Sequence, residues 1–559
     1  MALIYVLVLV FFLLYLISAF NKPRYPPGPR KLPFVGNVFQ VPNLRQWVQF
    51  SKWAKEFGPI FHLAVGPQHI IVLNTPEIVE ELFVRRSRVF SNRYAPHVAA
   101  EIMSAGQRTI FINGDTDEFR AVKKALHSAM NATASRRYRT LQDLESRMLL
   151  YHISELRREK DANTKMGTCS ERHWYSVVNR LATNVAVMIV YGLRVSEVYG
   201  SKKLARLGMQ FIKSPKPSRI CLCPARFCNA DGFPIFRLLP DYLAPWRIRA
   251  KQLHDREYGL YGGFLSEIMS DRKKGVDRPD CFVGAYIKER AEHGHEVLPG
   301  KGVADDGCLR DVFLAYAAGQ VLEAASDTTA CFMKTYVLFM LAYPEVLKKI
   351  RIELDSVVGS GRLPGFEDEE RLPYLIATIK EVLRCRPPIP LGLPHSPSED
   401  VIFDGYMIPK GSIVIGNVNA MHMDPVRFPE PTRFIPERWF ASGKLDTSEP
   451  MRWGTGPDQD RDNYVLGWGR RYCPGSHIAE ASIFITLSRL IWGLNMYSPT
   501  GNSPDPWNED TYSAGFVTNP HSYDVVFEPR SPEHYAVLQR SFDEGQEQWE
   551  ILGLAKDEL

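Results

Sequence analysis

The most informative feature of this chain is the run Leu466-Gly467-Trp468-Gly469-Arg470-Arg471-Tyr472-Cys473-Pro474-Gly475, near the C-terminus. It places one cysteine in a loop rich in glycine and arginine, just ahead of an apolar segment of helical length, Ile478 to Leu494. A thiolate in such a loop can bind a haem iron, because glycines let the backbone approach a flat porphyrin and arginine can pair with a propionate. A lone cysteine beside a helix is more often a free structural thiol, so the loop by itself leaves both interpretations open.

Three further motifs precede the loop: Ala324-Ala325-Ser326-Asp327-Thr328-Thr329, Glu381-Val382-Leu383-Arg384 and Pro436-Glu437-Arg438-Trp439. Together with the cysteine loop, and in this order, they resemble the cytochrome P450 family, and four ordered motifs are far more specific than any one. The resemblance runs from the proline-rich segment near residue 26 to about residue 530. It implies a mainly α fold with small β-sheets, a triangular helical prism around a buried haem b (iron protoporphyrin IX). Cys473 would be the axial thiolate ligand and therefore the metal-binding residue.

Length and composition agree with one large enzyme domain. The chain has 559 residues, of which 45% are hydrophobic and 23% charged, as in ordinary globular proteins. A net charge of +5 is too small to indicate nucleic-acid binding. The nine cysteines show no disulfide framework, which favours a reducing compartment.

The N-terminus predicts a membrane anchor. Leu3 to Phe20 is an uncharged run of about the minimum length that spans a bilayer, and positive charges begin at Lys22, which places the following domain in the cytosol. A secretory signal peptide is the alternative, but it would carry positive charge before a shorter apolar core. We therefore expect a transmembrane anchor over 1–21, a stiff proline-rich hinge over 22–36, a catalytic domain over 37–530 and a polar tail over 531–559.

The last four residues, Lys556-Asp557-Glu558-Leu559, spell a retention signal of the endoplasmic reticulum. A lumenal receptor reads that signal, whereas the predicted anchor leaves the C-terminus in the cytosol. We interpret the match as coincidence and expect a single-pass protein of the endoplasmic reticulum membrane, with its catalytic domain facing the cytosol.

Hydrophobic periodicity predicts a mostly helical body. Two strands, Ile60 to Val65 and Ile70 to Leu73, flank the hairpin signal Gly66-Pro67. Helices are expected near 136–160, 173–192, 246–272, 309–342, 344–358, 371–386 and 476–494, and short strands near 401–402, 413–415 and 525–527.

The helix near 309–342 is the expected wall above the haem. Asp327 and Thr328 interrupt its apolar middle, and a mid-helix hydroxyl can bond to the carbonyl one turn earlier and loosen the helix. Taken alone, these polar residues would be a solvated outer patch. The resemblance instead implies a catalytic proton relay formed by Asp327 and Thr328. Ala325 departs from the glycine that the family often has there.

Other residues take roles only from the resemblance. Glu381 and Arg384, three residues apart on one helix face, would join Arg438 in a structural lock near the haem, although alone they would be a weak exposed pair. His395 would reach a haem propionate; a turn histidine is the alternative. Arg471 and Gly475 of the cysteine loop would also contact the cofactor.

The segment after Gly114-Asp115 predicts a further cofactor-binding helix, with Phe119, Arg120, Lys123 and His127 as its contacts. The family usually has tryptophan and a basic residue at the places of Phe119 and Lys123, and phenylalanine cannot donate the indole hydrogen bond. Leu466 stands where an aromatic residue usually shields the thiolate, so leucine should exclude water while altering the iron potential.

A separate cluster, Cys221, Cys223 and Cys228, lies in a proline-containing stretch. A zinc site is the alternative to an insertion in the sequence, but the paired spacing typical of zinc ligands is missing.

The resemblance implies monooxygenation of a hydrophobic small molecule, as in microsomal fungal enzymes of secondary-metabolite biosynthesis. Electrons would come from NADPH-cytochrome P450 reductase, with cytochrome b5 as an alternative second donor, because the chain has no flavin or nicotinamide domain. A haem-thiolate isomerase, desaturase or ring-coupling enzyme and a catalytically silent haem protein are the alternatives. Substrate contacts are expected from 93–111, 317–321, 389–393 and 516–518.

Overall fold

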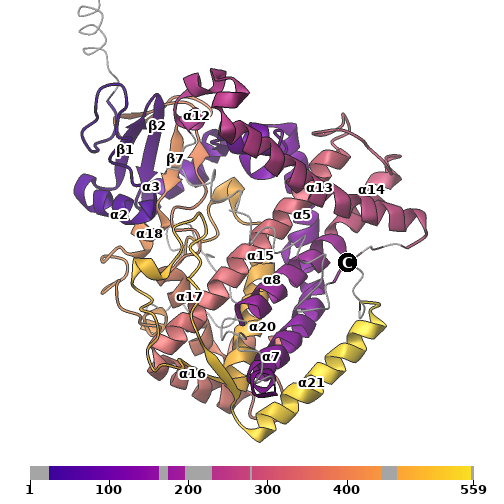
Figure 1. The fold of residues 1–559 in the computed structure, drawn as a ribbon. Helices are drawn as coiled ribbons and strands as arrows, with labels where there is room; N and C mark the ends of the chain where they lie inside the picture. The colour runs from indigo at the N-terminus through magenta and orange to yellow at the C-terminus, as the bar shows by residue number, and fades with distance from the viewer. Residues whose placement is uncertain are drawn as a thin grey trace, which may run out of the picture.

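The computed structural model describes residues 24–162, 174–194, 229–276, 278, 280–441 and 463–554. Its helices surround a long central helix, α15 (Asp311–Ala342), and its main sheet lies at one corner of the molecule (Figure 1). The other described α-helices are α2 (Gln46–Phe57), α3 (Pro76–Val79), α4 (Ser87–Phe90), α5 (Asp117–Met130), α6 (Ala132–Arg137), α7 (Arg139–Ala162), α8 (Trp174–Tyr191), α12 (Asn229–Gly232), α13 (Pro245–Lys273), α14 (Phe282–Glu292), α16 (Pro344–Val357), α17 (Pro373–Cys385), α18 (Val418–His422), α19 (Arg438–Ala441), α20 (Ser476–Gly493) and α21 (Pro532–Ile551). The predicted class, mainly helical with small sheets, is confirmed.

The main sheet has the strand order β1-β2-β7-β4-β3. β1 (Ile60–Val65) and β2 (Gln68–Leu73) form the predicted antiparallel hairpin, and β7 (Ile413–Gly416) joins β2 in parallel. The short strands β4 (His395–Ser396) and β3 (Asn92–Arg93) complete the sheet, so that His395 pairs with Arg93. Two smaller sheets pair β5 (Val401–Phe403) with β6 (Tyr406–Ile408), and β8 (Leu494–Tyr497) with β9 (Val526–Pro529).

Helix α15 is apolar on nearly every side, which is the pattern of a helix buried within a core. It packs against α8, α13 and α20. Its C-terminal half belongs to the largest hydrophobic cluster, with α17 and α20, and its N-terminal half to a second cluster, with α8 and α13. The central helix therefore connects both parts of the core and holds Thr328 between them.

The proline-rich segment does not stand off from the domain as a spacer. From Arg24 onward it lies along the sheet, where the Pro27 carbonyl accepts from the His62 N–H at 2.8 Å and the Arg24 carbonyl accepts from Met407 at 2.7 Å. A Cβ at Gly28 would lie 2.1 Å from the His62 carbonyl oxygen, so glycine permits this approach. Backbone hydrogen bonds attach the segment to β1 and β6, and its last residues form a turn in which Leu32 bridges to Gly36 and Phe34 has φ +62°.

The segment after residue 530 was expected to be a polar peripheral tail and instead contains α21, which packs on α7. Val537, Leu538 and Trp549 are buried along one face of this helix. Trp549 is 0% exposed and lies beneath the guanidinium of Arg194, which is 4.2 Å from the ring centroid. Its overall polarity concealed this narrow apolar face.

The predicted anchor over 1–21, the Cys221–Cys228 cluster and the terminal Lys556–Leu559 lie outside the described residues. Among the residues that the structure does describe, no single helix is both long and apolar enough to cross a membrane. α15 and α16 meet that criterion only as a pair, bent by 106°.

Candidate functional site

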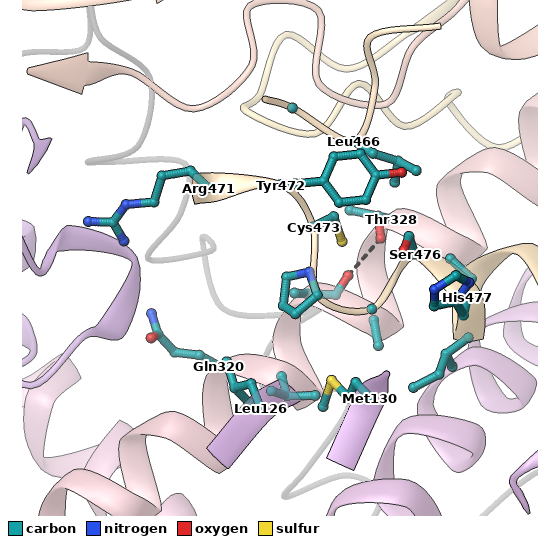
Figure 2. Close-up of a pocket in the computed structure, with 18 of the residues that line it drawn as sticks. Leu126, Met130, Gln320, Thr328, Leu466, Arg471, Tyr472, Cys473, Ser476 and His477 are labelled. Carbon is teal, nitrogen blue, oxygen red and sulfur yellow. Dashed lines mark hydrogen bonds between the residues drawn. The ribbon is translucent and has the colours of Figure 1, made fainter. Parts of the chain in front are cut away.

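A cavity of about 980 Å³ lies where α5, α8, α15 and α20 meet the cysteine loop. This volume is at the upper end of the range for small-molecule and cofactor sites. Figure 2 shows Cys473 and Thr328 at this pocket, with Gln320 and Arg471 at its margin. Segments far apart in the sequence thus contribute to one chamber.

The cysteine loop is folded back on itself before α20 begins. The Cys473 N–H donates to the Leu466 carbonyl at 2.9 Å, which closes the loop. Gly469 has φ +52°, and a Cβ there would lie 2.4 Å from the Phe83 carbonyl oxygen, so only glycine fits without a shift of the backbone. Cys473 therefore presents its side chain to the cavity three residues before α20 starts at Ser476.

The surroundings of Cys473 affect its thiol in opposite directions. Burial raises the pKa of the Cys473 thiol, the Gly475 N–H lowers it, and the charge of Glu480 raises it. The N-terminus of α20 also favours a negative charge at this point. Since the net pKa is raised, a cation at the sulfur is what would hold the thiolate, and a bound metal ion does so directly.

Among the cysteines that the structure describes, Cys473 alone lines the cavity. Cys281, Cys308, Cys331 and Cys385 are also free but lie elsewhere in the fold. The described residues therefore leave one candidate for a cysteine ligand at this pocket.

Four cations line the cavity near the loop: Arg93, Lys123, Arg470 and Arg471. The guanidinium groups donate to backbone carbonyls, Arg93 to Leu393 at 2.6 Å, Arg470 to Gly114 at 3.1 Å and Arg471 to Ser91 at 2.8 Å. Within the described chain, none of these three arginines pairs with a carboxylate.

Burial and the neighbouring positive charges lower the pKa values of three of these cations. Burial and then Arg470 lower the pKa of Arg471 to about 9, and burial followed by the charge of Arg471 lowers that of Arg93. The pKa of Lys123 is lowered as well, by burial and then by Arg470 and Arg471. Two carboxylates at this edge would offset part of the charge, and haem carries two propionates, so the donor set fits haem.

Phe119 has a different role from the one that a tryptophan would have. Its ring is 7% exposed, and the Arg471 guanidinium lies 4.0 Å from the ring centroid, with that of Arg470 at 5.7 Å. Phe119 cannot donate a hydrogen bond, but its face positions Arg471 by a cation–π contact.

Arg120 does not face the cavity. Helix α5 turns Phe119, Lys123 and His127 toward the pocket, at the i, i+4, i+8 spacing of one helix face. Arg120 lies about 100° away from Phe119 around the helix; its side chain is 59% exposed and pairs with Asp117. The structure therefore does not place Arg120 among the residues that line the cavity, unlike Phe119, Lys123 and His127.

His395 lines the cavity and is 3% exposed. Its Nδ1 lies 2.7 Å from the Phe90 carbonyl, and its ring stacks on Phe83 with centroids 3.9 Å apart. Because a carbonyl only accepts, Nδ1 carries the proton, and burial followed by the charge of Arg93 lowers the pKa of the ring. The neutral ring then offers Nε2 as an acceptor, so donation to a propionate requires that His395 first gains a proton.

Thr328 lines the cavity, and its hydroxyl donates to the Ala324 carbonyl at 2.7 Å, the bond drawn in Figure 2. Ser326 bonds to the Leu322 carbonyl in the same way, yet α15 continues as an unbroken helix. Asp327 does not line the cavity. The structure therefore places only the hydroxyl of the predicted pair on the wall.

Glu381, Arg384 and Arg438 meet in one buried cluster. Arg384 donates to both Glu381 oxygens at 2.8 and 2.9 Å, and Arg438 donates to Oε1 at 3.0 Å. Glu381 and Arg384 are 0% exposed, so this pair is not the weak surface contact that spacing alone suggests. Arg384 also donates to the carbonyls of His422 and Pro431, which ties α17 to the loop before α19.

Of the other predicted contacts, Leu466, His127 and Gly475 line the cavity, as do parts of 93–111, 317–321 and 389–393. No residue of 516–518 does. The sequence did not single out three further lining residues: Arg93, Gln320 and Arg470. Arg93 and Gln320 lay within predicted substrate segments. The sequence does not show which carbonyls or neighbouring residues orient these side chains.

Comparison with known proteins agrees with this site. A family profile described as Cytochrome P450 matches residues 26–527. The chain is 42% identical over 551 residues to Cytochrome P450 monooxygenase 231 of Postia placenta, which covers 96% of this chain and 95% of that protein. It is 32% identical over 558 residues to Cytochrome P450 monooxygenase virE of Hypocrea virens, with 99% and 93% covered. A solved zebrafish cytochrome P450 with abiraterone is similar in fold, with a TM-score of 0.64, 22% identity, and coverage of 87% of this chain and 100% of that chain.

Proposed function

The chain belongs to the cytochrome P450 family, whose members are oxidoreductases that hold haem through a cysteine thiolate, and on that premise we propose a specific role for it. It inserts one oxygen atom from dioxygen into a hydrophobic small molecule, in fungal secondary-metabolite biosynthesis. NADPH-cytochrome P450 reductase supplies the electrons. The observation that carries this proposal is that Cys473 lines the same cavity as Thr328 and four cations.

Each group of residues that lines the cavity has its own role in this proposal. Cys473 would hold the iron, while Arg93, Arg470 and Arg471 would bind the propionates. When bound, haem supplies the activation of oxygen. Leu466, which lines the cavity and packs against the main hydrophobic cluster, would exclude water from the sulfur.

On the α15 side of the cavity, Thr328 orients a proton donor. Its hydroxyl hydrogen is directed to the Ala324 carbonyl, so its oxygen is left to accept from a water in the cavity. A water held in this way points its second hydrogen away from Thr328, and Asp327, one residue earlier, replenishes the proton.

The direct test replaces the ligand. In Cys473→Ser and Cys473→Ala, the thiolate-type spectrum of the reduced carbon monoxide complex should disappear. A variant that retained this spectrum would refute the haem-thiolate assignment. Incorporation of labelled oxygen from dioxygen into product separates monooxygenation from isomerisation, desaturation or coupling.

The membrane location is part of the proposal. It is supported by the uncharged run Leu3 to Phe20 and by apolar side chains exposed in the described structure. Ile235, Leu238 and Tyr242, which are 72%, 83% and 81% exposed, lie close together in sequence just before α13. Such a group suits contact with a lipid surface.

Deleting residues 1–22 should move the protein from the membrane toward the soluble fraction and leave haem binding intact. A glycosylation tag placed after residue 530 should remain unmodified. Modification of that tag would reverse the proposed orientation and make the terminal Lys556–Leu559 signal readable.

A further inference from the structure

Gln320 lies on the cavity face of α15, eight residues before Thr328, and is 6% exposed. Figure 2 shows it at the pocket with α15 behind it. Its neighbours on this face, Ala317, Val321 and Ala324, are apolar. The carboxamide is thus a polar group on an otherwise apolar stretch of wall.

The hydrogen bonds of Gln320 fix the orientation of its amide. The Thr109 N–H donates to Oε1 at 2.5 Å, and the Thr109 hydroxyl donates to the same oxygen. A backbone N–H can only donate, so the atom that it meets must be the oxygen and not the nitrogen. Nε2 therefore points away from Thr109, and none of the described residues accepts from it.

Thr109 is itself held firmly. The preceding residue, Arg108, is 5% exposed and forms ion pairs with Glu257 of α13 and, at 3.3 Å, with Glu323 of α15. These contacts fix the loop against two helices. The amide of Gln320 cannot rotate without losing both bonds to Thr109, so its donor is pre-oriented.

We propose that Gln320 selects the substrate by donating from Nε2 to an acceptor oxygen of an otherwise apolar molecule, such as a ketone. The pre-oriented donor disfavours ligands that present an ammonium group at this place. Eight residues of α-helix rise about 12 Å, so the acceptor lies about two turns along α15 from the carbon that faces Thr328. This proposal rests on the monooxygenase function and adds the substrate class.

A purely structural role would use only Oε1, as an anchor for Thr109. Three variants separate the two roles. Gln320→Glu keeps oxygens for Thr109 but removes the Nε2 donor. Gln320→Met removes both functions at similar length, and Thr109→Val removes only the hydroxyl contact while its backbone N–H still orients the amide.

The test uses the haem-loaded full chain and two matched probe pairs, cyclododecanone with cyclododecane and menthone with menthane. Binding is measured by equilibrium dialysis and by the change in haem absorption. In the unmodified protein and in Thr109→Val, each ketone should bind about three- to tenfold more tightly than its hydrocarbon, the range expected for one neutral hydrogen bond. This preference should be lost in Gln320→Glu and Gln320→Met.

Three outcomes would overturn the proposal: no ketone preference in the unmodified protein, the same preference in Gln320→Glu, or no binding of any probe. An intact thiolate-type spectrum with no ketone preference would count against this inference alone. Loss of that spectrum from the unmodified protein would count against the proposed function itself.

Discussion

Replacing Glu381 by Gln should sharply destabilise the fold without changing any residue that lines the cavity. Its carboxylate accepts four hydrogen bonds: Arg384 Nε donates to Oε2, while Arg384 Nη2, Arg438 Nε and the Ile435 N–H donate to Oε1. Glutamine has one oxygen. If that oxygen takes the Oε1 position, the amide N–H₂ must face the Arg384 Nε–H, donor against donor.

The magnitude follows from burial. Arg384 is 0% exposed, and the side chain of Arg438 is 11% exposed, so neither cation can recover its lost partner from water. Removing one partner of a buried ion pair costs about 3–5 kcal/mol. Because domains are stable by only about 5–15 kcal/mol, the variant should lose a large share of its free energy of unfolding.

The assay is denaturant unfolding followed by circular dichroism, with haem absorption as a second probe. Glu430→Gln is the matched control, because Glu430 pairs with Arg433 in the same region with both side chains exposed, and it should change little. If Glu381→Gln yields no soluble protein, Arg438→Lys keeps a charge near Glu381 and should show a smaller loss. Equal stability of Glu381→Gln and Glu430→Gln would refute the reasoning.

Two further predictions concern coupling and pH. Thr328→Ala should keep haem and substrate binding but lower the product formed per NADPH, with the lost electrons recovered as hydrogen peroxide. The effect should be large, because positioned acid–base groups contribute about 10²–10⁴-fold to the rate. An unchanged ratio of product to NADPH would assign proton delivery to another group. Burial, then Lys31 and His69, lowers the pKa of His62 to about 2, whereas unfolded histidine titrates near 6.5. Stability present above pH 6.5 should therefore fall as pH decreases toward 2, because only the unfolded chain takes up the proton. Thermal midpoints measured from pH 8 to 5 should fall less steeply in His62→Gln; equal slopes would contradict this assignment.

The helical body could be predicted because its patterns are local. The predicted helix over 309–342 corresponds to α15, and the hairpin signal Gly66-Pro67 lies between β1 and β2 as expected. The tail was missed for the opposite reason. Trp549 and Leu538 gain their partners from α7 and Arg194, hundreds of residues away, so α21 looks polar when its composition is considered alone.

The site residues also divide into those that local motifs predict and those whose placement depends on the three-dimensional fold. Cys473 and Thr328 belong to continuous motifs, and both line the cavity. Arg120 does not line the cavity, because motif spacing alone did not show which face of α5 meets the pocket. The orientation of Gln320 depends on one backbone N–H at Thr109, a contact across 211 residues that no sequence pattern encodes.

The group formed by Arg93, Arg470 and Arg471 also affects how long the protein survives in a cell. These cations crowd one edge of the cavity, so a ligand with two carboxylates stabilises the folded chain by mass action, by about 2.7 kcal/mol at a hundred times its dissociation constant. When porphyrin is scarce, a larger fraction of the chains unfolds and is degraded. The steady-state amount of this protein should then follow the supply of porphyrin even when the transcript level is constant. Its degradation rate would therefore report on the amount of haem available in the cell.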